Sequence, residues 1–375
     1  MLFSDIYGLT DIKQALTNSV KQNHVAHAQM FIGRKGSANL ALALAFATYV
    51  NCENTVENDA CGECDSCKKM EKHIHPDVHF VYPSYKKSGK EVDNHKTFLQ
   101  KTWREFLIAS PYRVEFDWAE TIQADNKQCI ISVDNARYIK QFLSLKSFKG
   151  GYKIVLVWMP EKMNIPAANA ILKNLEEPPE KTLFLLVTSD IEKNITTIIS
   201  RCQSVQIPPF SDVEVTTFLE SKMQLLPEES GRIALMADGD LHEAIKLIDH
   251  NNSDEVEAYF QTWMRTCYGM KFDILVKDAD KYSKTSKDAQ KMLFQVGLNT
   301  MRNILLMHGE VQDLIRAQEE DKQFVQKFSV VVTREKLENI VPLLEEAYYH
   351  IERNVNAKIV FLDLSLSISK IFKSK

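Results

Sequence analysis

The sequence has 375 residues, 45% of them hydrophobic, and a net charge of −4. This length suits two or three domains, and the composition is that of globular proteins. It excludes a disordered chain, and no apolar run approaches the ~20 residues of a membrane span. The first residues show no secretion signal, and a dedicated nucleic-acid-binding protein is usually basic. We therefore expect a cytoplasmic protein, without a membrane partner, whose DNA contacts are at most local.

Short apolar runs alternate with helical patterns over the first 210 residues. Near-continuous apolar runs separated by helices predict a parallel sheet covered on both faces. One helix has clear signals, because Asn164 can cap it, Pro166 suits its first turn, and Pro178 and Pro179 end it. The predicted strands are 28–32, 78–82, 130–133, 154–157, 183–187 and 204–207.

The last third of the chain contains few residues that break helices. All but three of the 12 glycines and all but one of the 11 prolines lie before residue 250. Helix formers dominate the remainder, so we expect it to be almost entirely helical. Leu337, Ile340, Leu344 and Ala347 recur on one face of a helix, which is typical of a bundle core.

Residues 83–128 interrupt the alternation and are interpreted as an insertion on the α/β domain. We favour an excursion packed on its own domain, because aromatic side chains are mostly buried. Basic and aromatic residues together can also follow single-stranded nucleic acid, and this alternative stays open. The residues concerned are Lys86, Lys87, Lys90, Lys96, Lys101 and Arg104, with Trp103, Phe106, Tyr112, Phe116 and Trp118.

A glycine turn follows the first predicted strand, in the place of a phosphate-binding loop. That loop requires G-x-x-x-x-G-K-[ST], in which the lysine reaches the outer phosphates and the hydroxyl holds Mg²⁺. Gly33 and Gly36 are present, but Ala38, Asn39 and Leu40 occupy the positions of the second glycine, the lysine and the hydroxyl residue. Asn39 carries no charge and Leu40 cannot bind a metal, so the loop predicts the geometry of an ATPase without its chemistry.

The acidic motif of an ATPase is missing as well. A hydrophobic strand of this class should end in Asp-Glu, which holds Mg²⁺ and activates water. Strand 154–157 runs instead into Trp158 and Met159, and Glu161 lies two positions too late, so we expect it to point elsewhere. Two independent losses favour a chain that binds no ATP.

Several segments resemble bacterial DNA polymerase III clamp-loader subunits of the AAA+ superfamily. The resemblance covers most of residues 1–250 and is weaker at 351–356 (IERNVN). It implies an α/β AAA+ domain, a small helical lid and a helical collar, at 1–208, 209–250 and 251–375, with a zinc module at about 52–67. The segments that carry it are 3–8 (FSDIYG), 27–33 (HAQMFIG), 169–179 (NAILKNLEEPP) and 200–202 (SRC).

The resemblance also implies partners and site residues. Such a subunit assembles with motor-type and delta subunits, and the complex loads a sliding clamp onto primed DNA. Arg201 would act as an arginine finger on ATP bound by a neighbouring subunit, although spacing alone favours an ordinary surface ion pair. Lys173 is either a contact to DNA phosphates or a solvated helix lysine. His242 takes the place of the nucleotide-sensing arginine that the family carries in the lid.

Four of the seven cysteines form one cluster in the sequence. Cys52, Cys61, Cys64 and Cys67 follow the spacing C-x8-C-x2-C-x2-C. Four thiolates complete a tetrahedral shell around Zn²⁺ and leave no open position, so we expect a structural zinc site. Free thiols and an iron–sulfur cluster are the alternatives. The nearby histidines are interpreted as loop or core residues: His73, His75 and His79.

Two other functions remain as alternatives. The first is a catalytically active motor-type ATPase of the same family, against which Asn39, Leu40, Trp158 and Met159 argue. The second is a stand-alone zinc-containing DNA-binding protein, against which the negative charge and the complete cysteine shell argue.

Overall fold

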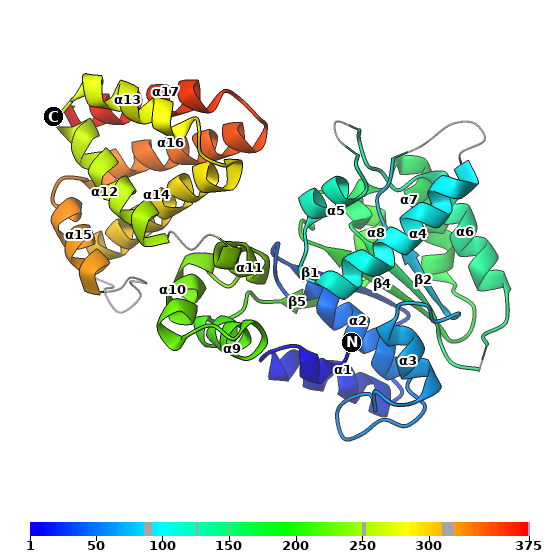
Figure 1. Cartoon of the computed structure of the whole chain (residues 1–375). Coiled ribbons are helices and arrows are strands. Elements are labelled where there is room, and N and C mark those ends of the chain that lie inside the picture. Colours follow the sequence, from blue (N-terminus) through cyan, green and yellow to red (C-terminus); the bar gives the residue numbers. More distant parts are fainter. Residues whose placement is uncertain (86–91, 125–126, 149, 250–252, 310–318, 374–375) are drawn as a thin grey trace. The chain divides into compact units, whose positions relative to one another are not determined.

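The computed structural model describes residues 1–85, 92–124, 127–148, 150–249, 253–309 and 319–373. They group into two compact units, Met1–Ser230 with Ala237–Ala244, and Gly231–Met236 with Ile245–Lys375 (Figure 1). The division at residues 208 and 250 stays a prediction. Among the described helices, none combines the length and apolar character that crossing a membrane requires.

The first unit is built on a five-stranded parallel sheet with the order β2-β3-β4-β1-β5. The predicted combination of an α/β domain with an all-helical region is therefore confirmed, and five of the six predicted strands are present. These strands are β1 (Ala28–Gly33), β2 (Val78–Val81), β3 (Lys153–Trp158), β4 (Thr182–Thr188) and β5 (Gln203–Ile207).

The predicted strand at 130–133 is wrong. Ile130 and Ile131 make only isolated bridges to neighbouring segments, and Val133 already begins α6 (Val133–Ser144). The Asn135 side chain accepts a hydrogen bond from the Ser132 N–H at 3.0 Å, which is one half of a capping box. This helix-start signal outweighs the short apolar run.

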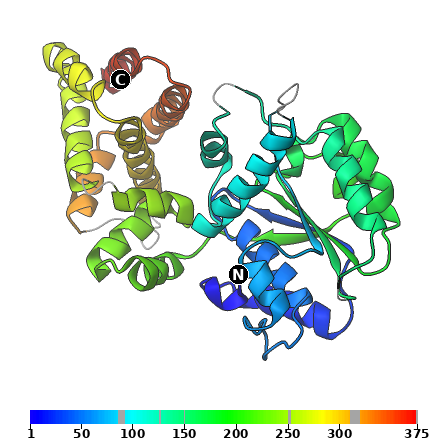
Figure 2. The same ribbon diagram turned by 45° about the vertical axis from the view of Figure 1, so that its right-hand side comes forward.

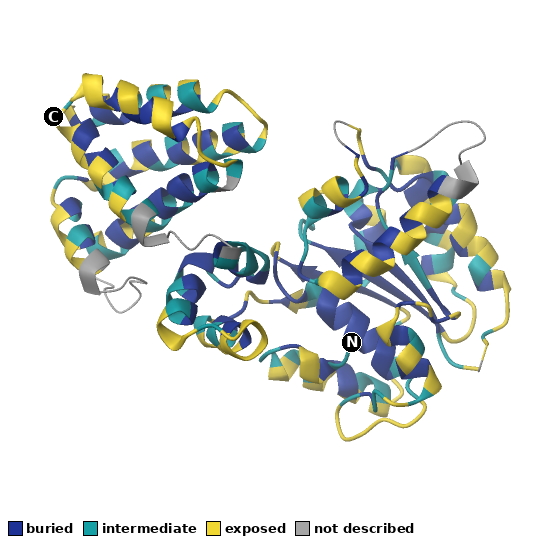
Figure 3. Ribbon diagram, in the orientation of Figure 1, coloured by how far each residue is buried: buried dark blue, intermediate teal, exposed yellow. Residues whose placement is uncertain are grey.

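Helices cover both faces of the sheet (Figure 2). On one face, α6 and α7 (Ile165–Glu176) pack on alternate residues of β1, β3 and β4. On the other face, Phe31 of β1 contacts Phe46 of α2 (Asn39–Val50). Strands β1, β3 and β4 are buried along their whole length, as expected for central parallel strands (Figure 3). Helix α7 begins as predicted, since the Asn164 side chain accepts from the Ala167 N–H at 2.9 Å.

The insertion forms α4 (Val92–Ala109) and α5 (Glu115–Thr121) and packs on the α2 face of the sheet. Trp103, Phe106 and Trp118 are buried, and Trp103 lies 5.1 Å from Trp118 between ring centroids. Burial of these rings favours the packing interpretation over an exposed stacking surface for nucleic acid. The predicted basic residues Lys86, Lys87 and Lys90 lie outside the described residues.

Shorter elements complete the first unit and lead into the second. Those near the sheet are η1 (Phe3–Asp5), α1 (Thr10–Lys21), α3 (Asp65–Glu71), η2 (Pro160–Lys162) and α8 (Thr196–Ile199). The helices of the region predicted as the lid are α9 (Asp212–Met223), α10 (Pro227–Ala237) and α11 (Leu241–Asp249).

The second unit is helical, as predicted. Trp263 stacks on Phe361 at a centroid distance of 4.9 Å and donates its indole N–H to Ser365 Oγ at 2.9 Å. All four residues of the predicted apolar stripe are buried in α16. The helices are α12 (Ser253–Tyr268), α13 (Phe272–Tyr282), α14 (Lys287–His308), α15 (Glu319–Ser329), α16 (Arg334–Glu352) and α17 (Ala357–Lys373).

Candidate functional site

The glycine turn joins β1 to α2, and its side chains are used for packing and for hydrogen bonds within the domain. The amide of Asn39 donates to the carbonyl oxygens of Gly33, at 3.4 Å, and Thr188, at 3.2 Å. Asn39 therefore ties the turn to the carboxyl end of β4. Leu40 is buried, 1% exposed, in the first turn of α2.

The segment before α11 packs directly against this turn. Gly36 has a φ of +68°, and a Cβ atom there would lie 1.6 Å from Asp240 Oδ1, so the site accepts only glycine. The Leu241 N–H donates to the Gly36 carbonyl at 3.1 Å. Burial raises the pKa of Asp240 to about 6. In its charged form this carboxylate places negative charge beside the turn, which disfavours a second anion there.

Trp158 joins the sheet to the insertion. Its ring lies 5.2 Å from Trp103 and 5.7 Å from Phe106 between centroids. Met159 adopts a left-handed backbone with a φ of 61° and donates its N–H to the Val187 carbonyl at 2.8 Å. The chain turns sharply here, and this turn carries Glu161 away from the end of β3.

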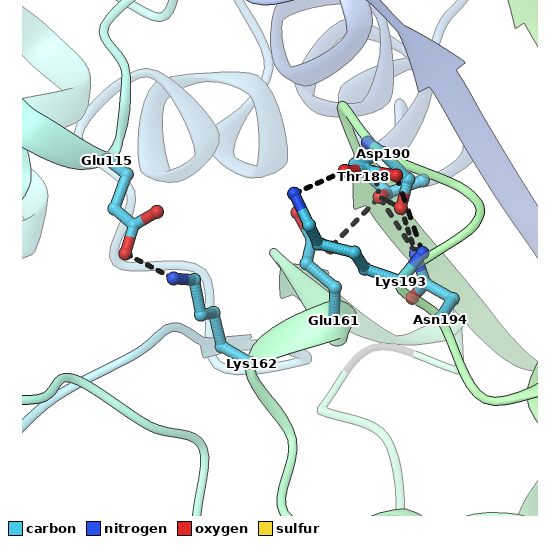
Figure 4. Close-up of polar contacts among 7 residues, drawn as sticks. All are labelled: Glu115, Glu161, Lys162, Thr188, Asp190, Lys193 and Asn194. Carbon is cyan, nitrogen blue, oxygen red and sulfur yellow. Dashed lines mark hydrogen bonds and ion pairs between the residues drawn. The ribbon is translucent and has the colours of Figure 1, made fainter. Parts of the chain in front are cut away.

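Glu161 points toward Thr188 at the carboxyl end of the neighbouring strand β4 (Figure 4). The Thr188 hydroxyl donates to Glu161 Oε2 at 2.9 Å, and burial raises the pKa of Glu161. Lys162 pairs with Glu115 of the insertion at 2.5 Å. Thr188 thus contacts Asn39 through its carbonyl and Glu161 through its hydroxyl. The only sequence signal for Thr188 is its place directly after the predicted strand 183–187.

The insertion covers the space between the glycine turn and the end of β3. A cavity of about 40 Å³ remains there, whereas small-molecule pockets usually measure ~300–1,000 Å³. His242 Nε2 lies 3.4 Å from Asp117 Oδ2 of α5, so His242 faces the insertion. The cavity is lined from the sheet side by Lys35, Gly36, Asn39, Trp158, Met159, Val187 and Ser189, and from the insertion by Pro111, Tyr112, Arg113, Val114 and Glu115.

The four predicted cysteine ligands converge. Their sulfur atoms all lie within 4.8 Å of one another, and none forms a disulfide. Cys52 Sγ lies 3.6 Å from the sulfurs of both Cys61 and Cys67, and Cys61 Sγ lies 3.9 Å from Cys67 Sγ. A tetrahedral zinc ion with ~2.3 Å bonds separates its sulfur ligands by about 3.8 Å. The arrangement therefore fits Zn²⁺.

Backbone N–H groups support the same sulfurs. The Cys64 N–H donates to Cys61 Sγ at 3.4 Å, and the Cys67 N–H donates to Cys64 Sγ at 3.4 Å. The Cys64 N–H, followed by the Glu63 N–H, lowers the pKa of Cys61 to about 6. Such hydrogen bonds favour the thiolate, which is the form that binds a metal.

The predicted finger and DNA residues lie on the surface of the first unit. Arg201 donates from Nε to Glu176 Oε1 at 2.6 Å and from Nη1 to the Thr197 carbonyl at 2.8 Å, while Nη2 also contacts Glu176. Its side chain is 31% exposed. Lys173 is exposed in the last turn of α7, the helix that also carries Glu176.

Comparison with known proteins gives one family and several relatives. Residues 8–211 match the family model described as DNA polymerase III, delta subunit. The chain is 24% identical to the Bacillus subtilis DNA polymerase III subunit delta', over 96% of this chain and 95% of that protein.

Two further similarities concern other subunits. Haemophilus influenzae DNA polymerase III subunit tau/gamma is 27% identical over 66% of this chain, and the match spans only 30% of that relative's length. A solved structure, the Bacillus subtilis DNA clamp loader delta protein, aligns with 96% of this chain and 100% of its own at 12% identity and a TM-score of 0.32.

The half-buried carboxyl of Asp240 predicts a pH-dependent stability. Its pKa is raised from 3.8 to about 6 by burial, so its stabilising protonated form is fully present below about pH 4 and is lost as the pH rises through 6. We expect Asp240→Asn, which keeps a side chain able to cap α11, to raise the free energy of unfolding by about 1–3 kcal/mol at pH 7.5 relative to the original chain. The gain should vanish near pH 4.

Thermal unfolding between pH 4 and 8 would measure this difference. Asp11→Asn in α1 is the matched control, because Asp11 is exposed and its loss changes the charge without relieving a buried group. If Asp240→Asn raises the free energy of unfolding by the same amount at pH 4 and at pH 8, the prediction is wrong.

Proposed function

The chain belongs to the DNA polymerase III delta subunit family, a clamp-loader family, and from this premise we propose that it acts as a delta-prime-type subunit. In this proposal it assembles with motor-type and delta subunits and hydrolyses no ATP itself. The assembled complex loads the sliding clamp onto primed DNA, and this chain supplies Arg201 to ATP bound by a neighbouring subunit. We place this activity in the cytoplasm.

The observation that carries the proposal is the filled nucleotide site. The cavity of about 40 Å³ is roughly a tenth of a small ligand pocket, and the insertion closes it. Opening it would expose Trp158, which is 5% exposed and packs on two aromatic rings of α4. Asn39 and Leu40 supply neither the charge nor the metal ligand of an ATPase. The chain's similarity to subunit delta' along almost its full length supports the same role.

Arg201 has the chemistry of a residue that acts on a neighbour's triphosphate. A guanidinium offers fixed donors to the γ-phosphate and stabilises charge that develops during phosphoryl transfer. In this chain Glu176 and the Thr197 carbonyl orient it at the surface. We propose that the neighbour's phosphate replaces Glu176 as the acceptor for Nη2 while Nε keeps its bond, so Glu176 acts as a positioning residue.

The remaining parts have supporting roles in the proposal. Cys52, Cys61, Cys64 and Cys67 would hold Zn²⁺, which completes its shell with four thiolates and stabilises the loop between α2 and α3. Lys173 would contact DNA phosphates without regard to sequence, which makes its contribution sensitive to salt.

An active motor-type ATPase is the second candidate, and the similarity to tau/gamma subunits favours it. That similarity covers two thirds of this chain but less than a third of the Haemophilus protein. The two candidates differ in one measurable property, because a motor-type subunit must bind Mg-ATP in its own turn between Gly33 and Leu40.

The isolated chain should not bind Mg-ATP. We expect no saturable binding of a fluorescent ATP analogue below about 1 mM, because the insertion fills the site and no lysine stands at the motif position. A motor-type subunit from the same source is the positive control. Saturable binding that is lost in Lys35→Ala, a residue lining the small cavity, would favour the motor-type ATPase instead.

Removal of the Arg201 guanidinium should impair the complex without preventing its assembly. We expect Arg201→Ala to lower the rate of clamp loading by a reconstituted complex at least ~10-fold. Arg201→Lys should not restore it, because an ammonium lacks the planar donor set. Glu176→Gln should give a smaller loss. Clamp-loading rates and subunit stoichiometry would be measured together.

Arg137→Ala is the matched control for this experiment. Arg137 is also an exposed arginine in an ion pair, with Asp134 at 3.0 Å, but it lies on α6. A normal rate of clamp loading by the Arg201→Ala complex would refute the role of Arg201 as an arginine finger. Equal decreases of the rate in Arg201→Ala and Arg137→Ala would show a general effect of surface charge instead.

The purified chain should contain one zinc ion, bound by the cysteine cluster. We expect Cys64→Ser to abolish stoichiometric zinc and to lower the melting temperature by about 5 °C or more, since structural zinc contributes directly to folding. Elemental analysis and thermal unfolding would measure both effects. Cys202→Ser, a half-buried cysteine outside the cluster, should keep its zinc. Iron in place of zinc, or a melting temperature that chelators leave unchanged, would contradict the prediction.

A further inference from the structure

A groove follows the free edge of the sheet along β2. Strand β2 pairs only with β3, so its other side is one of the two sheet edges (Figure 1). The groove has a volume of about 760 Å³, within the usual range of ligand clefts, and lies between α4 and α6. His79 of the strand stacks on Phe142 of α6 and Phe80 contacts Trp103 of α4, so a helix flanks each face of the edge.

The main-chain groups of β2 alternate between β3 and the groove. The Ile154 N–H donates to the Asp77 carbonyl at 2.8 Å. A parallel ladder repeats every two residues, so His79 and Val81 also face β3, and Phe80 and Tyr82 direct their N–H and C=O groups to the free side. Apart from the ladder between β2 and β3, no main-chain hydrogen bond of Phe80 or Tyr82 is found among the described residues.

Two buried side chains along the groove also lack partners. His73 and Trp103 are 7% and 1% exposed, and both line the groove. Among the described residues nothing bonds to His73 Nδ1 or Trp103 Nε1. Buried polar groups are nearly always satisfied in folded proteins, so these two mark polar positions in the wall of the groove.

The charge along the groove is positive. Lys96 of α4 reaches across to α6, with its ammonium 3.7 Å from the centre of the Tyr138 ring, and Arg104 lies further along α4. Asp134 also lines the groove, but it is paired with Arg137 at 3.0 Å. Burial lowers the pKa of His79 to about 4, so at neutral pH the positive charge comes from Lys96 and Arg104.

We propose that this groove binds an acidic segment of a partner protein in extended conformation, which adds to the sheet as a sixth strand beside β2. Main-chain hydrogen bonds to Phe80 and Tyr82 would supply the register, and Lys96 and Arg104 would select acidic side chains. The proposal rests on the strand edge and the charge of the groove, and it does not depend on the role of Arg201 or of the nucleotide site.

Two other occupants fit the observations less well. A single nucleic-acid strand needs exposed aromatic faces on which bases stack, whereas Trp103 is buried and Tyr82 stacks on it at 4.4 Å. A second copy of this chain would bring an identical positive edge against the first, and like charges facing each other oppose pairing.

Fluorescence anisotropy with the full chain would test the proposal. The probes are labelled hexapeptides in which Asp alternates with Val, Thr or Phe, and matched peptides with Lys in place of Asp. We expect at least one acidic probe to bind, and its Lys counterpart to bind at least ~10-fold more weakly. Because alternate N–H groups of a strand point the same way, N-methylation of every second residue should abolish binding in one pattern and leave it nearly unchanged in the other.

Variants of the chain provide the second half of the test. Lys96→Glu combined with Arg104→Glu should weaken the best acidic probe at least ~10-fold. Lys101→Glu is the matched control, because Lys101 lies on the same helix outside the groove and pairs with Glu105 at 3.7 Å. It should change binding less than about 2-fold, and unchanged circular dichroism would show that all variants fold.

Several results would overturn the proposal. If none of the acidic peptides binds to the folded chain, the groove does not bind an acidic strand. Equal weakening by both methylation patterns would exclude strand addition. Binding of an oligothymidylate that the double variant abolishes, without peptide binding, would assign the groove to nucleic acid. A dimer in sedimentation that Lys96→Glu with Arg104→Glu disrupts would assign it to a second copy of the chain.

Discussion

The contact between Trp158 and the aromatic rings of α4 determines how the first unit is built. Trp158 ends β3, where we expect an ATPase of this class to carry an acidic residue, and its ring lies 5.2 Å from that of Trp103 between centroids. Burial of large aromatic rings contributes a few kcal/mol each, so this contact holds the insertion against the carboxyl end of β3. The segment between α4 and α5 then lines the remaining cavity of about 40 Å³. A carboxylate at position 158 would be buried in this aromatic cluster without compensation.

The residues around that contact bond to one another within the domain. Asn39 ties the turn to β4, Gly36 admits Asp240 at close range, and Glu161 bonds to Thr188. In the proposed role, the absence of ATP binding therefore depends on several residues of the site, and a single added lysine or carboxylate would not create such binding.

Local signals in the sequence predicted most of the helices and strands. They did not predict the contacts between segments that lie far apart in the chain. Five strands follow from apolar runs and the cysteine cluster from its spacing, because both depend on neighbours in the chain. The wrong strand at 130–133 shows that a short apolar run is ambiguous when a capping box overlaps it. The contact of Trp158 with Trp103 joins residues 55 positions apart, and no periodic pattern in the sequence predicts it. The ion pair of Arg201 with Glu176 and the free edge of β2 also depend on which distant segments the fold brings together. Local sequence patterns therefore do not predict them.

Strand order also separates the two surfaces assigned to partners. Arg201 lies two residues before β5, which is one edge strand of the sheet, and the groove follows β2, which is the other. Four steps of about 4.8 Å place these edges roughly 19 Å apart. The proposed roles of Arg201 and of the groove therefore rest on opposite edges of the sheet, and a substitution at one edge removes no contact at the other.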